Sequence, residues 1–71
     1  MFEERLKSAR NDKHLTQKAV ADYLGINLEA YQHYEYGVRK PPFEKIVKLC
    51  QLLEISSDWL LCLSDTKNRI P

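Results

Sequence analysis

The chain of 71 residues is long enough for one domain, which a single hydrophobic core must hold together. Lysine and arginine number 11 and aspartate and glutamate 10, so a net charge of +1 gives no overall positive field that would indicate a polyanionic partner. No apolar run approaches the roughly 18 residues that a membrane span requires, and the N-terminal residues lack the basic-then-apolar order of a signal peptide. We therefore expect a cytoplasmic protein that makes no membrane contact.

Helical periodicity runs through the sequence without a repeat or a linker, and it predicts an all-α fold of five helices. The first helix should extend from about Phe2 to Asp12, because Phe2, Leu6 and Ala9 recur about one turn apart. These three residues should face the core.

Two short helices joined by a tight turn are predicted next. Thr16 and Asn27 can each accept a hydrogen bond from the free N–H groups at a helix start. Gly25 and Gly37 can adopt the left-handed conformation that ends a helix. Two short helices that leave one face free are typical of helix-turn-helix proteins, which place the second helix in the major groove of DNA.

An apolar residue precedes each of three predicted helix caps, including Ser56 further along the chain. Such a residue can pack on the fourth helical position and fix the angle at which the chain enters the helix. The pairs are Leu15 with Val20, Ile26 with Tyr31, and Ile55 with Leu60.

The fourth and fifth helices follow Pro41 and Pro42, which stop any upstream helix. The fourth should carry one apolar stripe of Phe43, Ile46, Val47, Cys50 and Leu53. The fifth begins after Ser56 and should hold Trp59, Leu60 and Leu63. The domain is expected to occupy residues 1–65, and the polar tail 66–71 to be disordered.

Neither the cysteines nor the histidines have the spacing of a metal site. Cys50 and Cys62 lie singly in apolar runs, and we interpret them as reduced, buried residues that fill the core. His14 and His33 match no compact zinc pattern. Since no nucleophile lies in a glycine-rich turn and the domain has little room for a shielded cleft, we expect no enzyme activity, no metal and no cofactor.

A helical wheel of the third predicted helix separates two faces. Ala30, Tyr31 and Tyr34 gather on the side expected to face the core. The opposite side holds Glu29, Gln32, His33 and Tyr36, with Leu28 at its edge. Glutamine can pair with adenine N6 and N7, glutamate can accept from cytosine N4, and leucine can contact the thymine methyl group. The alternative is an ordinary solvated helix face.

The loop after Gly37 reads Val38-Arg39-Lys40, and no acidic residue follows until Glu44. Basic side chains at the end of a reading helix can neutralise DNA phosphates. We therefore predict phosphate contacts from Arg39 and Lys40, with a solvated basic loop as the alternative.

Taken together, these residues resemble the Cro and phage-repressor (Xre-type, lambda-repressor-like) helix-turn-helix family over about residues 2–65. The matching positions are Leu15-Thr16-Gln17, Ala21, Leu24-Gly25-Ile26, Tyr31, Tyr34-Glu35, Gly37, Arg39, Pro41 and the ending Ile55-Ser56-Ser57-Asp58-Trp59-Leu60-Leu61. The resemblance implies a compact five-helix domain that binds operator DNA as a dimer and regulates transcription, as a repressor of the phage or prophage type.

The resemblance also implies roles for single residues. It assigns base contacts to Leu28, Glu29, Gln32 and His33. It assigns phosphate contacts to Arg10, Gln17, Asn27, Tyr36, Arg39 and Lys40. Gln17 would also brace the reading helix, and Arg10 would form an internal ion pair with Glu35. Leu28 and Glu29 stand where the family often has uncharged polar side chains, and Pro42 stands where a serine or aspartate cap is expected.

One reading helix covers only about four or five base pairs, which predicts a homodimer on a palindromic duplex. Leu61 and Leu63 are the predicted dimer contact, because the fifth helix has more apolar residues than one buried face requires. A protein-interaction module, such as an antitoxin-like or adaptor domain, is the alternative function. Its aromatic surface would come from Tyr23, Tyr31, Tyr34 and Tyr36.

Overall fold

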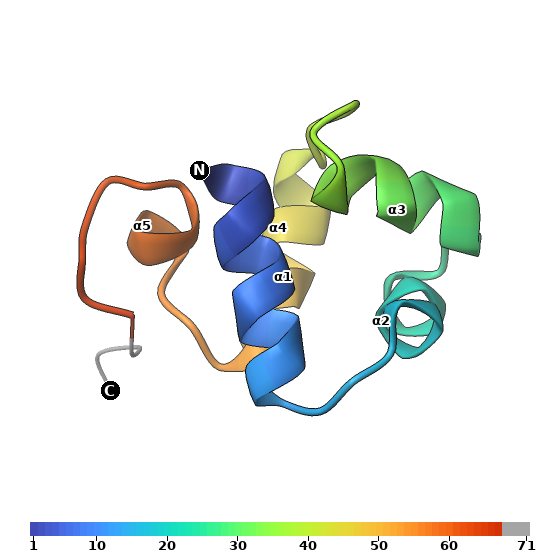
Figure 1. Ribbon diagram of the computed structural model, residues 1–71, viewed down its shortest axis with the longest axis horizontal. Helices are drawn as coiled ribbons and strands as arrows, with labels where there is room; N and C mark the ends of the chain where they lie inside the picture. Colours follow the sequence, from blue (N-terminus) through green and yellow to red (C-terminus); the bar gives the residue numbers. More distant parts are fainter. Residues whose placement is uncertain (68–71) are drawn as a thin grey trace.

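The computed structural model describes residues 1–67, which form five helices. These are α1 (Phe2–Asp12), α2 (Gln17–Leu24), α3 (Leu28–Glu35), α4 (Phe43–Leu53) and α5 (Ser57–Leu60). Helix α1 lies at the centre with α4 behind it, α2 and α3 lie on one side, and α5 lies on the other (Figure 1). The all-α prediction is confirmed. Within residues 1–67 no helix has the length and apolar content needed to cross a bilayer.

Each of the five helices turns apolar side chains toward one shared core. The largest of those that are at most 1% exposed are Leu6, Val20, Leu24, Tyr31, Leu49, Leu53 and Leu60. Burying one leucine or valine side chain stabilises a fold by about 1.5–3 kcal/mol, so this set supplies the main driving force for folding. Phe2, Leu6 and Ala9 of α1 are all buried, as their spacing predicts.

The predicted apolar stripe of α4 is wrong at two positions. Phe43 is 77% exposed and Val47 40% exposed, so neither belongs to the core. The core-facing residues keep helical spacing but are Ile46, Leu49, Cys50 and Leu53. Because α4 is apolar on more than one face, its sequence allows two stripes. Packing against the other helices selects the one that contains Leu49.

Each of the five helices is followed, one or two positions after its last residue, by a residue with positive φ. These residues are His14, Gly25, Gly37, Glu54 and Cys62, with φ between 56° and 79°. The N–H of the following residue donates back to a carbonyl in the last helical turn, for example from Ile26 to Ala21 at 3.1 Å and from Leu63 to Asp58 at 2.7 Å. This is the Schellman pattern, which satisfies carbonyls that a helix end leaves free.

Three of the four connections between helices share one three-residue joint. It consists of the left-handed residue, an apolar residue and a cap, in the order His14-Leu15-Thr16, Gly25-Ile26-Asn27 and Glu54-Ile55-Ser56. The cap oxygens accept from backbone N–H groups of the next helix at 3.0 Å for Thr16, 2.7 Å for Asn27 and 3.2 Å for Ser56. The predicted caps are therefore confirmed, and each joint also satisfies the end of the preceding helix.

The first and second joints allow a matched test of the left-handed position. Gly25→Ala should lower the free energy of unfolding by about 1 kcal/mol, because a side chain disfavours this conformation. No steric cost adds to this, since nothing lies within 4 Å of the Cβ that alanine would introduce. His14→Gly, at the same position of the first joint, should raise the free energy of unfolding. The gain should be smaller than the loss in Gly25→Ala, since glycine also loses more entropy on folding. Denaturant unfolding measures both, and effects of the same sign would contradict the interpretation.

Helix α5 is shorter than the sequence predicts. It ends at Leu60, so Leu63 lies beyond it and is 75% exposed. Cys62 is half-buried and takes the left-handed conformation at the helix end, so the prediction of a buried core residue is wrong there, whereas Cys50 is buried. The tight turn after α5 leads the chain away before a second helical turn can form.

The segment after α5 folds back onto α1. The Arg5 guanidinium lies 5.0 Å from the Trp59 ring centre and donates to the carbonyls of Trp59 and Ser64 at 2.7 and 2.8 Å. The Lys67 carbonyl accepts from the Ser56 N–H at 2.8 Å. Of the tail 66–71, which was predicted to be disordered, residues 68–71 lie outside the described part of the chain.

Candidate nucleic-acid interface

Helix α3 lies beside α2 at the edge of the molecule, with one side packed and one side open (Figure 1). Tyr31 and Tyr34 enter the core, and their rings meet edge to face with centres 6.3 Å apart. Ala30, predicted for the core, is half-buried. The exposed residues at the open side are Leu28, Glu29 and Tyr36.

Gln32 and His33 are half-buried, although the helical wheel predicts an outward position for both. Gln32 turns toward α2, where its amide donates to the Gln17 side-chain carbonyl at 3.1 Å. The His33 backbone carbonyl accepts from the N–H groups of Val38 and Arg39 at 3.0 and 3.2 Å, so the loop folds back over the last turn of α3. The most open part of the helix is therefore its first turn.

A buried ion pair fixes the end of α3 to α1. Arg10 Nε and Nη2 donate to the two Glu35 carboxylate oxygens at 2.5 and 3.1 Å, and the Glu35 side chain is 0% exposed. Arg10 Nη1 also donates to the Leu15 carbonyl in the first joint at 2.8 Å. The Tyr31 hydroxyl and the Gln17 amide complete the set of donors to Glu35. The ion pair expected between Arg10 and Glu35 is thus present, and it is more deeply buried than a surface pair.

Protonation states in this cluster follow from its hydrogen bonds. Burial acts to raise the pKa of Glu35, but the donors Arg10, Tyr31 and Gln17 together outweigh it and hold the pKa below its usual range. Burial beside the carboxylate raises the pKa of the Tyr31 hydroxyl. Glu35 is therefore an anion at neutral pH, and Tyr31 keeps its proton as a donor.

The basic loop has an acidic neighbour that sequence reasoning missed. The Glu3 side chain of α1 lies against Gly37, where an added Cβ would be 3.1 Å from Glu3 Cγ. Hydrogen bonds from its own backbone N–H and from the terminal amine lower the pKa of Glu3, and the charge of Lys40 contributes. Lys40 Nζ also lies 5.7 Å from the Phe2 ring centre. In the sequence, the first acidic residue after the loop is Glu44. The fold, however, brings Glu3 to the loop from the N-terminal helix α1.

The other predicted phosphate contacts occupy different environments. Asn27 and Tyr36 are exposed at the two ends of α3, and Arg39 is exposed in the loop. Gln17 is half-buried at the start of α2. Arg10 is 8% exposed and donates three hydrogen bonds within the protein, so its main role here is structural. All these DNA contacts stay predictions.

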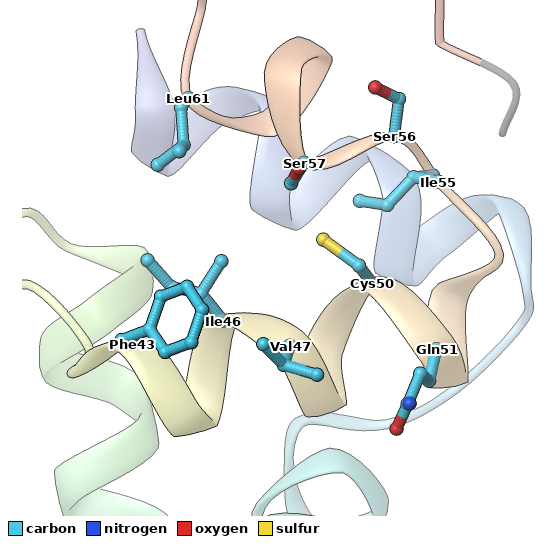
Figure 2. A pocket seen from close by; sticks show the side chains of 9 residues that line it. All are labelled: Phe43, Ile46, Val47, Cys50, Gln51, Ile55, Ser56, Ser57 and Leu61. Carbon is cyan, nitrogen blue, oxygen red and sulfur yellow. The ribbon is translucent and has the colours of Figure 1, made fainter. Parts of the chain in front are cut away.

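A shallow groove of about 450 Å³ lies between α4 and α5, on a different part of the surface (Figure 2). Phe43 and Val47 of α4 line one side and Leu61, 42% exposed, lines the other. The Cys50 thiol points into the groove from its floor. Leu63, two residues beyond Leu61, adds a further exposed apolar side chain nearby. The two predicted dimer residues thus lie at or near an apolar surface that includes residues from α4.

The chain belongs to the helix-turn-helix family, whose model matches residues 6–60. It is 44% identical over 61 residues to the HTH-type transcriptional regulator YqaE of Bacillus subtilis (strain 168), covering 86% of this chain and 53% of the relative. It is 43% identical over 59 residues to the cryptic phage CTXphi transcriptional repressor RstR of Vibrio cholerae, covering 83% and 53%. The chain spans about half the length of these curated relatives.

Solved structures agree with the sequence comparison. The P22 c2 repressor in complex with a synthetic operator superposes with a TM-score of 0.82 at 25% identity, covering 90% of this chain and 97% of that one. The solution structure of the DNA-binding domain of the same repressor gives a TM-score of 0.79 at 28% identity, covering 93% and 90%. The expected likeness to phage repressors is therefore confirmed.

Proposed function

We propose that this protein is a sequence-specific, double-stranded DNA-binding regulator of transcription that acts in the cytoplasm as a repressor of the phage or prophage type. The observation that carries the proposal is helix α3 itself: its first turn is open, and its last residue is held to α1 by the buried Arg10–Glu35 pair. A fixed helix with one free side is what readout of base edges in the major groove requires. The relatives named as transcriptional regulators favour this function over a protein-interaction module.

In the proposed complex, the first turn of α3 enters the major groove with Leu28, Glu29, Gln32 and His33 facing the bases. Phosphates on either side are contacted by Gln17, Asn27, Tyr36, Arg39 and Lys40, with Arg10 nearby. Two tyrosines of the four considered for a protein interface, Tyr31 and Tyr34, are buried, which reduces the aromatic surface that the alternative function would use.

Selection of bound sequences from a random duplex library tests the proposal. A repressor of this kind should enrich a short motif, and its affinity should fall steeply between low and moderate salt because phosphate contacts release counterions. Enrichment of no motif, together with binding that salt does not change, would contradict DNA recognition.

The phosphate contacts of the loop give a more specific expectation. Arg39→Ala should weaken binding to all duplexes alike and lower the slope of log affinity against log salt by about one unit. Lys40→Ala should do the same but less strongly, because Glu3 lies beside the loop and partly offsets the Lys40 charge. Titrations at several salt concentrations measure the slope. An unchanged slope with altered base preference would overturn the assignment.

Leu28 is the apolar residue of the reading surface and is 40% exposed. We expect it to contact a thymine methyl group, the apolar feature that base edges offer in the major groove. Because burying a methyl-sized contact contributes about 0.8 kcal/mol, uracil in place of that thymine should weaken wild-type binding about fourfold. Leu28→Ala should be almost indifferent to the same replacement. Equal sensitivity of both proteins at every thymine of the site would assign Leu28 to packing instead.

We further propose that the protein binds a palindromic duplex as a homodimer through Leu61 and Leu63. Support comes from the exposed apolar surface at the α4–α5 groove, which lies apart from the reading surface (Figures 1 and 2). Two half-sites about 34 Å apart on one face of the duplex are then expected.

A further inference from the structure

One arginine of α1 closes the turn that follows α5. Arg5 Nη1 donates to the carbonyls of Trp59 and Ser64 at 2.7 and 2.8 Å, so a single nitrogen atom binds the chain just before and just after residues 60–63. The guanidinium also lies 5.0 Å from the Trp59 ring centre, and its other terminal nitrogen, Nη2, donates to Asp65 at 3.3 Å. The Arg5 side chain is 25% exposed, so the protein shields most of it from water. Arg5 therefore fixes the distance between the two ends of this turn.

The closed turn carries the two predicted dimer residues, Leu61 and Leu63. Both side chains are exposed, so the core does not hold them in place. The backbone N–H groups of Cys62 and Leu63 donate to carbonyls of α5 at 3.0 and 2.7 Å, and these bonds hold the turn on its α5 side. At its other end, the Arg5 guanidinium ties Ser64 to α1. Without Arg5, that end loses its hydrogen bond to α1, and the turn can sample more conformations.

Order in this turn affects how tightly two chains can pair. A segment that is already fixed in the monomer loses less conformational freedom when a second chain packs on it, and such preorganisation raises affinity. A dimer with two-fold symmetry contains the same contact twice, so any ordering cost enters its dissociation constant twice. A cost of about threefold in each chain would therefore weaken the dimer about tenfold.

We propose that Arg5 is a positioning residue for the homodimer: by joining both ends of the turn, it holds Leu61 and Leu63 in the arrangement that a second copy of this chain packs against. This inference rests on the proposed function, because it requires that the dimer forms through these two leucines. It adds that a residue of α1 sets how tightly two chains pair, although α1 supplies neither of the predicted contact residues.

Arg5→Met tests the inference, since methionine keeps an unbranched apolar stem and cannot donate to either carbonyl. Sedimentation over a range of protein concentrations should give a dimer dissociation constant about tenfold higher than that of wild type. Affinity for a duplex with a single half-site should stay unchanged, because α5 lies on the opposite side of α1 from α2 and α3 (Figure 1). Both measurements are made at a temperature at which thermal unfolding shows the proteins fully folded.

The matched control is Lys7→Met, which removes the same charge from the same helix at an exposed position. It should leave the dissociation constant at the wild-type value. If Arg5→Met lowers the unfolding temperature but leaves the dissociation constant unchanged, Arg5 only stabilises the fold and the inference is wrong. If wild type is a monomer at every concentration, the proposed dimer itself fails, and the inference with it.

Proteolysis of the monomer tests the turn separately. At concentrations well below the dissociation constant, chymotrypsin should cut after Leu61 or Leu63 about threefold faster in Arg5→Met than in wild type or Lys7→Met, since cleavage requires an open segment. Equal rates in all three proteins would overturn the role of Arg5 whatever the dimer result. Should Arg5→Met fail to fold, Arg5→Lys keeps the charge and the stem but ends one bond short of the Nη1 position. It should shift both measurements in the same direction.

Discussion

Glu35→Ala should lower the free energy of unfolding by about 3–5 kcal/mol, because it leaves the Arg10 guanidinium buried without its counter-charge. The Glu35 side chain is 0% and the Arg10 side chain 10% exposed, so water cannot replace the lost acceptor. DNA affinity should fall as well, since the end of α3 is no longer held to α1. Denaturant unfolding and a duplex titration measure the two effects.

The exposed pair between Lys18 and Asp22 on α2 is the matched control, with side chains 73% and 64% exposed. Asp22→Ala should change stability little, because solvent screens such pairs and they contribute little. A loss for Glu35→Ala no larger than the loss for Asp22→Ala would contradict the buried role. A double-mutant cycle with Arg10→Ala should also give a clear coupling energy.

Glu35 should also make stability depend on pH. Since its folded-state pKa lies below the ordinary value of about 4.3, the unfolded chain binds more protons in the acid range. The stabilisation is complete above the ordinary pKa and is lost as the pH falls through the lower folded-state pKa. Below about pH 4, the free energy of unfolding should therefore fall more steeply with falling pH in wild type than in Glu35→Gln. Parallel pH profiles would contradict this.

Joint replacement of Leu61 and Leu63 by aspartate should weaken binding to a two-half-site duplex by on the order of 100-fold or more. Both side chains are exposed, so the fold should tolerate charge there. If they form the dimer contact, the charges prevent pairing and remove the advantage that linked binding events have over independent ones. Sedimentation should show a monomer where wild type is a dimer.

Binding to a duplex with a single half-site is the internal control for this variant. Its affinity should match that of wild type, because the reading surface on α3 is untouched. If the variant still pairs in solution and keeps full affinity for the two-half-site duplex, the dimer contact lies elsewhere on the surface.

Sequence patterns predicted the fold well where single residues determine the local structure. Thr16, Asn27 and Ser56 cap helices because their oxygen atoms suit free N–H groups, and Gly25 and Gly37 end helices because they tolerate positive φ. The left-handed ends at His14, Glu54 and Cys62 were not predicted, since these residue types do not demand that conformation. There the fold imposes the conformation on residues that do not favour it.

Sequence patterns could not predict features that depend on residues far apart in the chain. Glu3 reaches the basic loop only because α1 packs beside it, 34 residues before Gly37. Gln17 and Gln32 meet only because of the angle between α2 and α3. The predicted core stripe of α4 was wrong for a related reason. Local periodicity fits Val47 as well as Leu49, and only packing against the other helices distinguishes them.

At the repeated joint, the residues that hold α3 in place differ from the residues that are proposed to contact bases. At the start of α3, Gly25, Ile26 and Asn27 end one helix, enter the core and cap the next, using backbone conformation, an apolar side chain and one oxygen atom. None of these tasks involves the exposed side chains of Leu28 and Glu29. In the proposed complex, substitutions at those two positions would alter the recognised sequence while the helix keeps its place, so a new DNA target would not require a rebuilt fold.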